Sequence, residues 1–137
     1  MALVLDTGPL LAAIDRDDPD HARCEQLIQS ATEPRIVPAP VLVELDDWCR
    51  SKLSVADFLA FLDDVLAGAF RVEALTLRDH ERAGSLEAQY ADNDVGFVDA
   101  AVLAVVERLA EPKLATLDHR HFSAMRPVHV GALQLLP

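Results

Sequence analysis

Short apolar runs alternate along the chain with longer segments in which apolar residues recur every three or four positions. The short runs predict β-strands at residues 3–5, 35–37, 70–75, 114–117 and 128–136. The longer segments predict helices at residues 10–14, 19–31, 40–49, 55–67, 76–90 and 96–109. Alternating strands and helices are typical of an α/β fold, in which helices pack against a mainly parallel sheet.

Particular residues mark several of the expected helix ends. Asp18 followed by Pro19 predicts an N-cap and the first residue of a helix. Ser54 with Asp57 resembles a capping box, Thr76 predicts a further cap, and Gly68 predicts a C-terminal stop. The helix at 96–109 is apolar on nearly every face, which predicts that it is buried.

The length of 137 residues predicts one domain over residues 1–137. With 51% hydrophobic residues the chain is too apolar to be disordered. Its longest apolar run, Ala100 to Val106, is far shorter than the roughly 18 residues of a membrane span. The first residues do not resemble a signal peptide, so we expect a cytoplasmic protein with no membrane partner. In that reducing compartment Cys24 and Cys49 are expected as buried thiols rather than a disulfide.

The charge balance is strongly acidic, with 12 Lys and Arg against 23 Asp and Glu and a formal net charge of −11. A field of this sign repels nucleic acid at long range and attracts cations and basic peptides. An acidic surface also improves solubility, so the net charge alone does not indicate a site. The informative acids are those placed where solubility does not explain them.

Two acids follow predicted strands, and two others lie among apolar residues near helix starts. Asp6 and Asp118 come directly after strands, where ligands bind in open parallel sheets, although an Asp there can also serve as a helix cap or turn residue. Apolar neighbours surround Asp99 and Glu44, and an ionised acid in such surroundings must be paired, hydrated or bound to a metal. The alternative for Asp99 is that it caps a helix that begins later. Oxygen ligands from these four acids would suit Mg²⁺ or Mn²⁺.

Four segments of the chain together resemble the PIN domain, and specifically the VapC-type toxins of bacterial toxin–antitoxin systems. The segments are residues 4–12 (VLDTGPLLA), 41–45 (VLVEL), 96–100 (GFVDA) and 115–122 (ATLDHRHF). Each motif is weak alone, but their order and spacing are specific, and the resemblance spans essentially the whole chain. It implies a three-layer α/β/α fold around a short, mainly parallel central sheet of four to five strands.

The resemblance also implies an endoribonuclease that depends on Mg²⁺ or Mn²⁺, forms a homodimer and is inhibited by a small VapB-type antitoxin. Carried over by position, the catalytic and metal-binding acids would be Asp6, Glu44, Asp99 and Asp118, with Asp6 and Asp99 as the most direct ligands. The supporting residues would be Thr7, Asp92 and Thr116. Some relatives carry a further acid two residues after the fourth, where this chain has Arg120, which argues against a second fully occupied metal site.

The RNA substrate is less well specified. An aromatic content of 5% favours recognition of a folded RNA by its shape over stacking of single-stranded bases, and both transfer RNA and a ribosomal RNA loop are compatible. Phosphate contacts are expected from Arg120, Arg126 and His119, which follow the fourth acid, and from Arg16. The alternative for each is a solvated surface charge.

Two other functions are weighed against the nuclease. His119 and His121 beside Asp118 could belong to a zinc site, but the sequence offers no clear third nitrogen or thiolate ligand. A PIN-like module without catalysis could instead bind a basic partner through an acidic pocket.

The acidic charge also leads to an expectation about the antitoxin. A short antitoxin helix is expected in an apolar groove formed by the first half of the chain. A basic tail would follow it, and an Arg or Lys of that tail would reach the four acids and replace the metal.

Overall fold

The computed structural model describes residues 1–137, which form five strands and seven α-helices. The strands are β1 (Leu3–Val4), β2 (Arg35–Pro38), β3 (Arg71–Glu73), β4 (Lys113–Ala115) and β5 (Gln134–Leu136). The helices are α1 (Thr7–Ile14), α2 (His21–Ser30), α3 (Ala39–Lys52), α4 (Val55–Leu66), α5 (Leu77–Gln89), α6 (Phe97–Arg108) and α7 (His119–Ala124), with a 3₁₀ turn, η1 (Ala91–Asn93), before α6. No helix has the length and apolar character needed to cross a membrane.

All strand pairs are parallel, as the sequence predicts. β1, β2 and β3 form one sheet in that order, and β4 pairs with β5 in a second. A bridge between Leu5 and Ala115 joins the two, so that β1 lies beside β4. The expected sheet is therefore present as two short segments, with the end of β1 at their junction.

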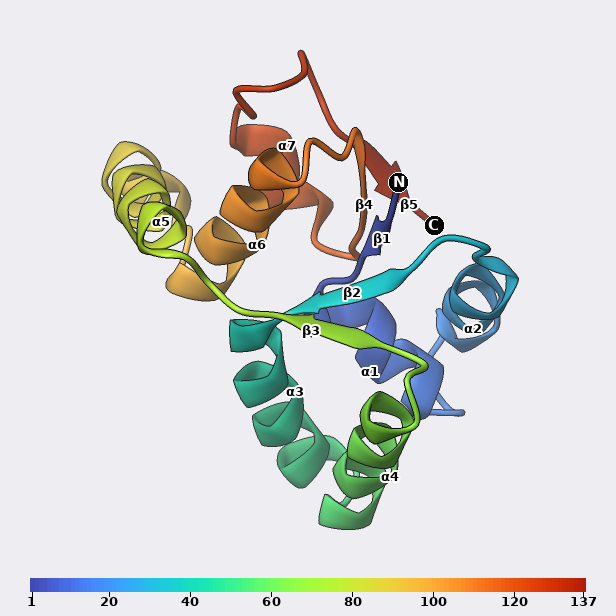
Figure 1. The fold of residues 1–137 in the computed structure, drawn as a ribbon. Helices are drawn as coiled ribbons and strands as arrows, with labels where there is room; N and C mark the ends of the chain where they lie inside the picture. Colours follow the sequence, from blue (N-terminus) through green and yellow to red (C-terminus); the bar gives the residue numbers. More distant parts are fainter.

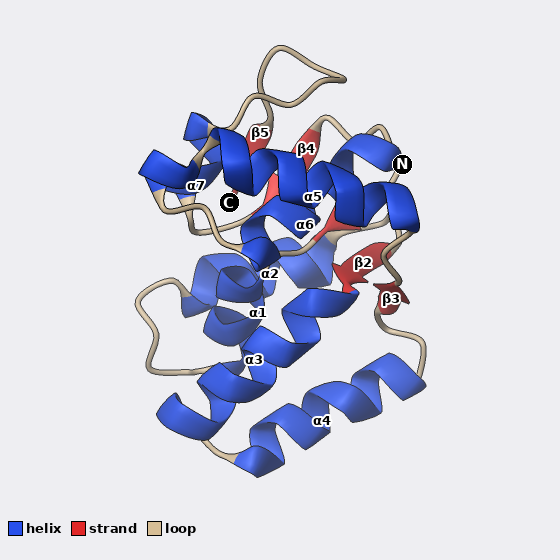
Figure 2. Cartoon of the chain, turned by 90° about the vertical axis from the view of Figure 1, so that its left-hand side faces the viewer, coloured by secondary structure: helices blue, strands red, loops and turns tan.

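The helices cover the sheet from two sides. Figures 1 and 2 show α1 to α4 on one side and α5 to α7 on the other. α6 lies between α5 and the strands, and its residues from Ala100 to Val106 are all buried, which confirms the prediction from its apolar surface. The three-layer α/β/α arrangement implied by the resemblance is confirmed.

Most of the predicted helix ends are confirmed. The Ser54 side chain accepts the N–H of Asp57 at the start of α4, and Thr76 forms a reciprocal capping box with Asp79 at the start of α5. Gly68, just after α4, has a φ of 89°, a conformation that a side chain disfavours. The two cysteines are buried and free, as expected.

Three local details differ from the predictions. α2 begins at His21 after Asp20, because the carboxylate of Asp18 accepts the N–H of Asp20 in a turn instead of capping a helix at Pro19. The predicted strand at 128–136 is ordered as a strand only at Gln134–Leu136. The short helix α7, which starts directly after Asp118, was not predicted.

Candidate active site

The four predicted acids meet in one pocket, although they come from four separate parts of the chain. Asp6 follows β1, Glu44 lies in the second turn of α3, Asp99 lies in the first turn of α6, and Asp118 precedes α7. A pocket of about 560 Å³ is lined by Asp6, Gly8, Leu11, Asp18, Glu44, Trp48, Lys52, Asp99, Leu117 and Asp118. Asp99 is not the N-cap of α6, because Gly96 has that position.

Asp6 is held in this pocket by Thr116, the residue that follows β4. Its side chain is 4% exposed, and Oδ2 accepts a hydrogen bond of 2.8 Å from the Thr116 hydroxyl. The same hydroxyl oxygen accepts the N–H of Asp118 at 3.0 Å, so Thr116 couples two of the acids. Oδ1 of Asp6 is buried without a partner. An orphaned carboxylate oxygen is costly in an apolar interior, and a bound cation would remove that cost.

Gly8 allows the first turn of α1 to approach the segment that carries Asp118. A Cβ at this position would lie 3.2 Å from Cβ of Leu117. The glycine of the first motif therefore brings the ends of β1 and β4 together, and with them Asp6 and Asp118.

Two of the four acids, Asp6 and Asp99, hold protons more tightly than isolated carboxyl groups. Burial raises the pKa of Asp6 to about 7, the hydrogen bonds from the Thr116 hydroxyl and the Thr7 backbone oppose this, and the negative charges of Asp99 and Glu44 raise the pKa further. Burial also raises the pKa of Asp99 to about 6, assisted by the charges of Asp118 and Glu44. A cation in the pocket would reverse both effects, because it stabilises the ionised form.

The imidazole of His121 lies between two of the acids. Its Nδ1 is 3.0 Å from Oδ2 of Asp99 and 2.6 Å from Oδ2 of Asp118. Asp118 fixes this position because its Oδ1 also accepts the backbone N–H of His121 at 3.1 Å. Burial lowers the pKa of His121, but the hydrogen bond to Asp118 and the charges of Asp118 and Asp99 outweigh it and raise the pKa. A protonated His121 thus offsets part of the acidic charge.

The donor set fits a divalent cation. Asp99, Asp118 and His121 each offer one ligand atom, and these atoms lie within 4.8 Å of one another. Asp6 contributes the unpartnered oxygen, and Glu44 lines the same pocket. Carboxylate oxygens with at most one nitrogen are ligands that Mg²⁺ and Mn²⁺ accept.

Comparison with known proteins places this chain in a family. The PIN-domain family model matches residues 3–126. Ribonuclease VapC26 of Mycobacterium tuberculosis (strain ATCC 25618 / H37Rv) is 33% identical over 135 residues, which cover 98% of this chain and 100% of the relative. This chain is a VapC-type PIN domain.

Solved structures agree on the fold of this VapC-type PIN domain. Mycobacterium tuberculosis VapC20, described as a sarcin-ricin loop cleaving toxin, superposes with a TM-score of 0.82 at 22% identity, over 94% of this chain and 98% of VapC20. The VapBC2 complex from Rickettsia felis, bound to a DNA fragment from its promoter, matches with a TM-score of 0.71 at 16% identity and 100% coverage of both chains.

Several residues expected in the site of this VapC-type PIN domain lie outside the pocket. The expected phosphate-binding residues are all exposed, and none lines the pocket: Arg16, His119, Arg120 and Arg126. Asp92 is exposed on η1 and also lies outside it. Thr7 is fully buried next to Asp6, with its hydroxyl unpartnered. Of the proposed His-x-His pair only His121 joins the acids, so the pair does not form a common zinc site.

Three polar or aromatic pocket residues, Asp18, Trp48 and Lys52, are not predicted as site residues from the sequence. The sequence predicts Asp18 as a helix cap, places Trp48 within the helix at 40–49, and leaves Lys52 beyond the end of that helix. The signal available in the sequence was the spacing of Glu44, Trp48 and Lys52, four residues apart, which places them on one face of a helix.

Proposed function

We propose that this VapC-type PIN domain is a divalent-metal-dependent endoribonuclease, the toxin of a toxin–antitoxin pair. The observation that carries the proposal is the convergence of Asp6, Glu44, Asp99 and Asp118 in one pocket, with a buried and unpartnered oxygen on Asp6. The relative at 33% identity is named a ribonuclease, which supports the same activity. Mg²⁺ is the proposed cofactor, with Mn²⁺ as a substitute.

The fold fixes the acids before any substrate arrives. Asp6 is held by Thr116, Asp118 is held by its cap on α7, and Asp99 is held within the first turn of α6. A bound Mg²⁺ would orient the scissile phosphate, lower the pKa of an attacking water and offset charge on the leaving oxygen. Asp6 and Asp99, with pKa values of about 7 and about 6, must release protons to hold the cation, so cation binding strengthens as pH rises through this range.

A structured RNA is the proposed substrate, with transfer RNA and ribosomal RNA as the candidates. VapC20, which shares the fold, is described as cleaving the sarcin-ricin loop, which is consistent with a looped RNA. His119 and Arg120 on α7, Arg126 beyond it and Arg16 after α1 would contact phosphates at the rim of the site.

The purified protein should cleave RNA when Mg²⁺ is present and lose this activity in excess EDTA. Restoring Mg²⁺ or Mn²⁺ should restore cleavage, because the acids bind these ions reversibly. Gel analysis of total RNA measures the effect. Undiminished cleavage in EDTA would contradict metal dependence, and no cleavage with either ion would favour the non-catalytic module that binds a basic partner.

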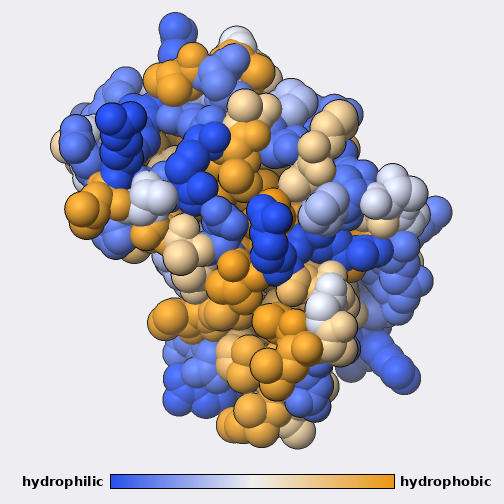
Figure 3. All heavy atoms as spheres, in the orientation of Figure 1, coloured by the Kyte–Doolittle hydropathy of each residue, from blue (hydrophilic) through white to orange (hydrophobic).

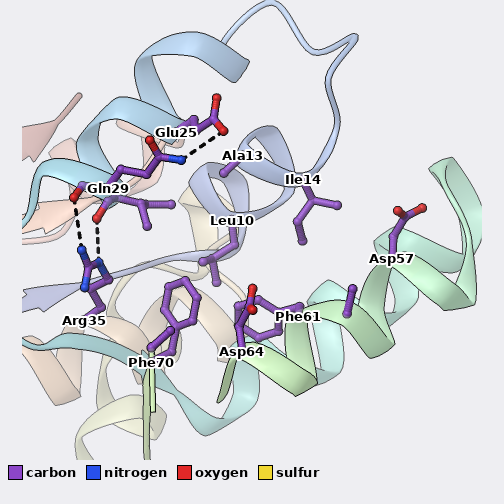
Figure 4. Close-up of a pocket in the computed structure, with 13 residues that line it drawn as sticks. Leu10, Ala13, Ile14, Glu25, Gln29, Arg35, Asp57, Phe61, Asp64 and Phe70 are labelled. Carbon is purple, nitrogen blue, oxygen red and sulfur yellow. Dashed lines mark hydrogen bonds between the residues drawn. The ribbon is translucent and has the colours of Figure 1, made fainter. Parts of the chain in front are cut away.

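An apolar groove in the first half of the chain is the proposed docking site for a VapB-type antitoxin helix. Figure 4 shows Leu10, Ala13 and Ile14 of α1 facing Phe61 of α4 and Phe70 across a pocket of about 440 Å³. Outside it, α4 exposes Val55, Leu59 and Leu66 to solvent. Figure 3 shows apolar side chains gathered over α3 and α4 in the lower half of the face drawn. An amphipathic helix could bury this surface.

The groove should be required for antitoxin binding and dispensable for cleavage. Ala60 is exposed and lines the groove, so Ala60→Glu would place a charge against the apolar face of the antitoxin helix. We expect at least about a tenfold loss of antitoxin affinity, because burying an unpaired carboxylate is costly. Calorimetric titration with the cognate antitoxin measures this. Ala88→Glu, on exposed α5, is the matched control, and equal affinities of the two variants would contradict the assignment.

The basic tail of the antitoxin is proposed to inhibit by binding the four acids. An arginine there could bridge two carboxylates and replace the cation. Changing that arginine to alanine should leave a complex that forms but cleaves RNA once Mg²⁺ is added. A complex that stays fully inhibited would indicate blocked RNA access instead.

A C₂ homodimer is proposed from an exposed apolar patch on α3, α5 and α6. Val43 of α3 and Phe97 of α6, which are 74% and 41% exposed, line one pocket together with Ala39, Pro40, Leu75 and Val98. Leu77 at the start of α5 is 89% exposed. A clustered apolar surface of this kind is typical of an interface.

Val43→Glu is expected to dissociate the dimer. The native protein should scatter light as a particle of twice 15.0 kDa, and the variant as a monomer, because the new charge would be buried at the interface. Val128→Glu is the matched control, since both valines are 74% exposed and Val128 lies outside the patch. A native monomer, or a dimer that survives Val43→Glu, would contradict this interface.

A further inference from the structure

An aromatic residue and a cation line the pocket beside the acidic cluster. Trp48 and Lys52 lie on α3, one and two turns after Glu44, on the same face of the helix. Trp48 is the only tryptophan of the chain. Nζ of Lys52 lies 5.1 Å from the centroid of the Trp48 ring. The face of α3 that carries Glu44 therefore also carries an aromatic ring, with one cation above that ring.

The acidic charge around the pocket would repel the phosphates of an RNA, and Lys52 opposes that repulsion. Five acids line the pocket: Asp6, Asp18, Glu44, Asp99 and Asp118. Lys52 is the only cationic residue among the lining side chains. A phosphate next to the acids would meet negative charge on most sides, so the lysine is the group able to attract it there.

The Trp48 ring can accept a second flat group. Trp48 is half-buried and packs with other apolar residues against the core, whereas Lys52 is exposed. An ammonium that is itself exposed to water is held only weakly above a ring, so it can be displaced. Nucleic-acid bases stack on aromatic side chains with little dependence on base identity.

We propose that Trp48 and Lys52 bind one unpaired nucleotide of the RNA substrate beside the acidic cluster. The base stacks on Trp48 and displaces the Lys52 ammonium, which then contacts the phosphate of that nucleotide. This inference rests on the proposed ribonuclease function, and it gives the substrate a further property: an unstacked base next to the cleaved bond, as in a loop. It also revises the expectation from composition, because one well-placed aromatic residue can stack a base although aromatic content is low.

Fluorescence of the single tryptophan tests the proposal directly. Adenosine 5′-monophosphate contains a base and a phosphate but no phosphodiester bond, so it can be titrated into the native protein without cleavage. We expect saturable quenching of Trp48 by this nucleotide, weaker binding of adenosine, and no quenching by ribose 5-phosphate. Equal quenching by the nucleotide and ribose 5-phosphate, or none by either, would overturn the proposal.

Two variants separate the roles of the ring and the cation. Lys52→Ala should reduce the affinity for the nucleotide to that for adenosine, whereas Arg50→Ala, also exposed on α3 but outside the pocket, should leave it unchanged. Equal losses in the two variants would overturn the role of Lys52. Quenching by arginine amide but not by the nucleotide would assign the ring to a basic peptide instead.

Cleavage kinetics provide a second measurement. Trp48→Leu should raise KM by about 5- to 150-fold, the range typical of losing one stacked base, with a smaller change in kcat. Trp48→Phe, which keeps a stacking face, should recover most of this loss. A Trp48→Phe variant as impaired as Trp48→Leu would contradict stacking. If the native protein cleaves no RNA, the proposed function fails, but the nucleotide titration still decides whether Trp48 and Lys52 bind a nucleotide.

Discussion

Asp99→Asn should leave a folded protein whose rate of RNA cleavage is lower by roughly 100- to 1,000-fold, the usual effect of removing a group that stabilises the transition state electrostatically. Asp99 lies at the start of α6, with Oδ2 3.0 Å from Nδ1 of His121, and its pKa is raised by burial and by the charge of Asp118. Asparagine keeps the shape of the side chain but loses the charge that would hold a cation. Single-turnover cleavage at saturating Mg²⁺ measures the loss.

The matched control for this variant is Asp94→Asn. Asp94 is exposed and has a φ of 58°, a conformation that asparagine tolerates well, so the fold should not change. Full activity of Asp94→Asn beside a nearly inactive Asp99→Asn would locate the effect in the pocket. Full activity of Asp99→Asn would remove this acid from the mechanism.

Asp6→Asn should abolish cleavage and, without metal, make the protein more stable at pH 8. The Asp6 carboxylate is 4% exposed and has one unpartnered oxygen, so its ionised form is costly. Asparagine can still accept the Thr116 hydrogen bond and carries no charge. The site therefore reduces stability when empty, as functional sites often do.

The pH dependence of this effect follows from the pKa of Asp6. That pKa rises from the ordinary value of 3.8 to about 7 in the folded protein, so below pH 4 the carboxyl is protonated in both states. As pH rises from 4 to 7 the unfolded chain loses this proton first, and the folded state loses stability by roughly 4 kcal/mol at most. Asp6→Asn should remove this loss.

Urea unfolding in EDTA at pH 5 and pH 8 tests the prediction. The free energy of unfolding of Asp6→Asn should exceed that of the native protein at pH 8, with a smaller difference at pH 5. Adding Mg²⁺ should stabilise the native protein and leave the variant unchanged, since only ligands that bind the folded state stabilise it. If Asp6→Asn is less stable than the native protein at pH 8 in EDTA, the ionised Asp6 carboxylate does not destabilise the metal-free protein, and the prediction is wrong.

The sequence predicts the fold well where local chemistry is decisive. Ser54 and Thr76 cap helices as expected, and the apolar surface of α6 correctly predicts its burial. Predictions are wrong where two local arrangements compete. Asp18 can cap a helix or close a turn, and it closes a turn, so α2 begins two residues later than it would with Asp18 as its cap.

The four candidate acids could be predicted because each has an unusual position in the sequence. Glu44 and Asp99 interrupt apolar segments, and Asp6 and Asp118 follow strands, so each has a local reason to be noticed. Their convergence depends on the Leu5–Ala115 bridge, which no single segment predicts.

The other pocket residues have no such local signal. Trp48 belongs to the apolar face of an amphipathic helix. It lines the pocket only because α3 packs beside the residues that follow β1 and begin α6. Lys52 resembles any solvated lysine at a helix C-terminus. His121 was considered for zinc, but its position between Asp99 and Asp118 depends on the unpredicted helix α7.

The ends of the cleaved RNA test the central claim most directly. Asp6, Glu44, Asp99 and Asp118 would hold a metal that activates water, and hydrolysis by water would leave a 3′-hydroxyl on one fragment and a 5′-phosphate on the other. Ligation of an adaptor that requires a 5′-phosphate, before and after kinase treatment, identifies these ends. We expect efficient ligation without kinase. Fragments that ligate only after kinase treatment and carry 2′,3′-cyclic phosphates would show attack by the RNA 2′-hydroxyl and contradict the mechanism.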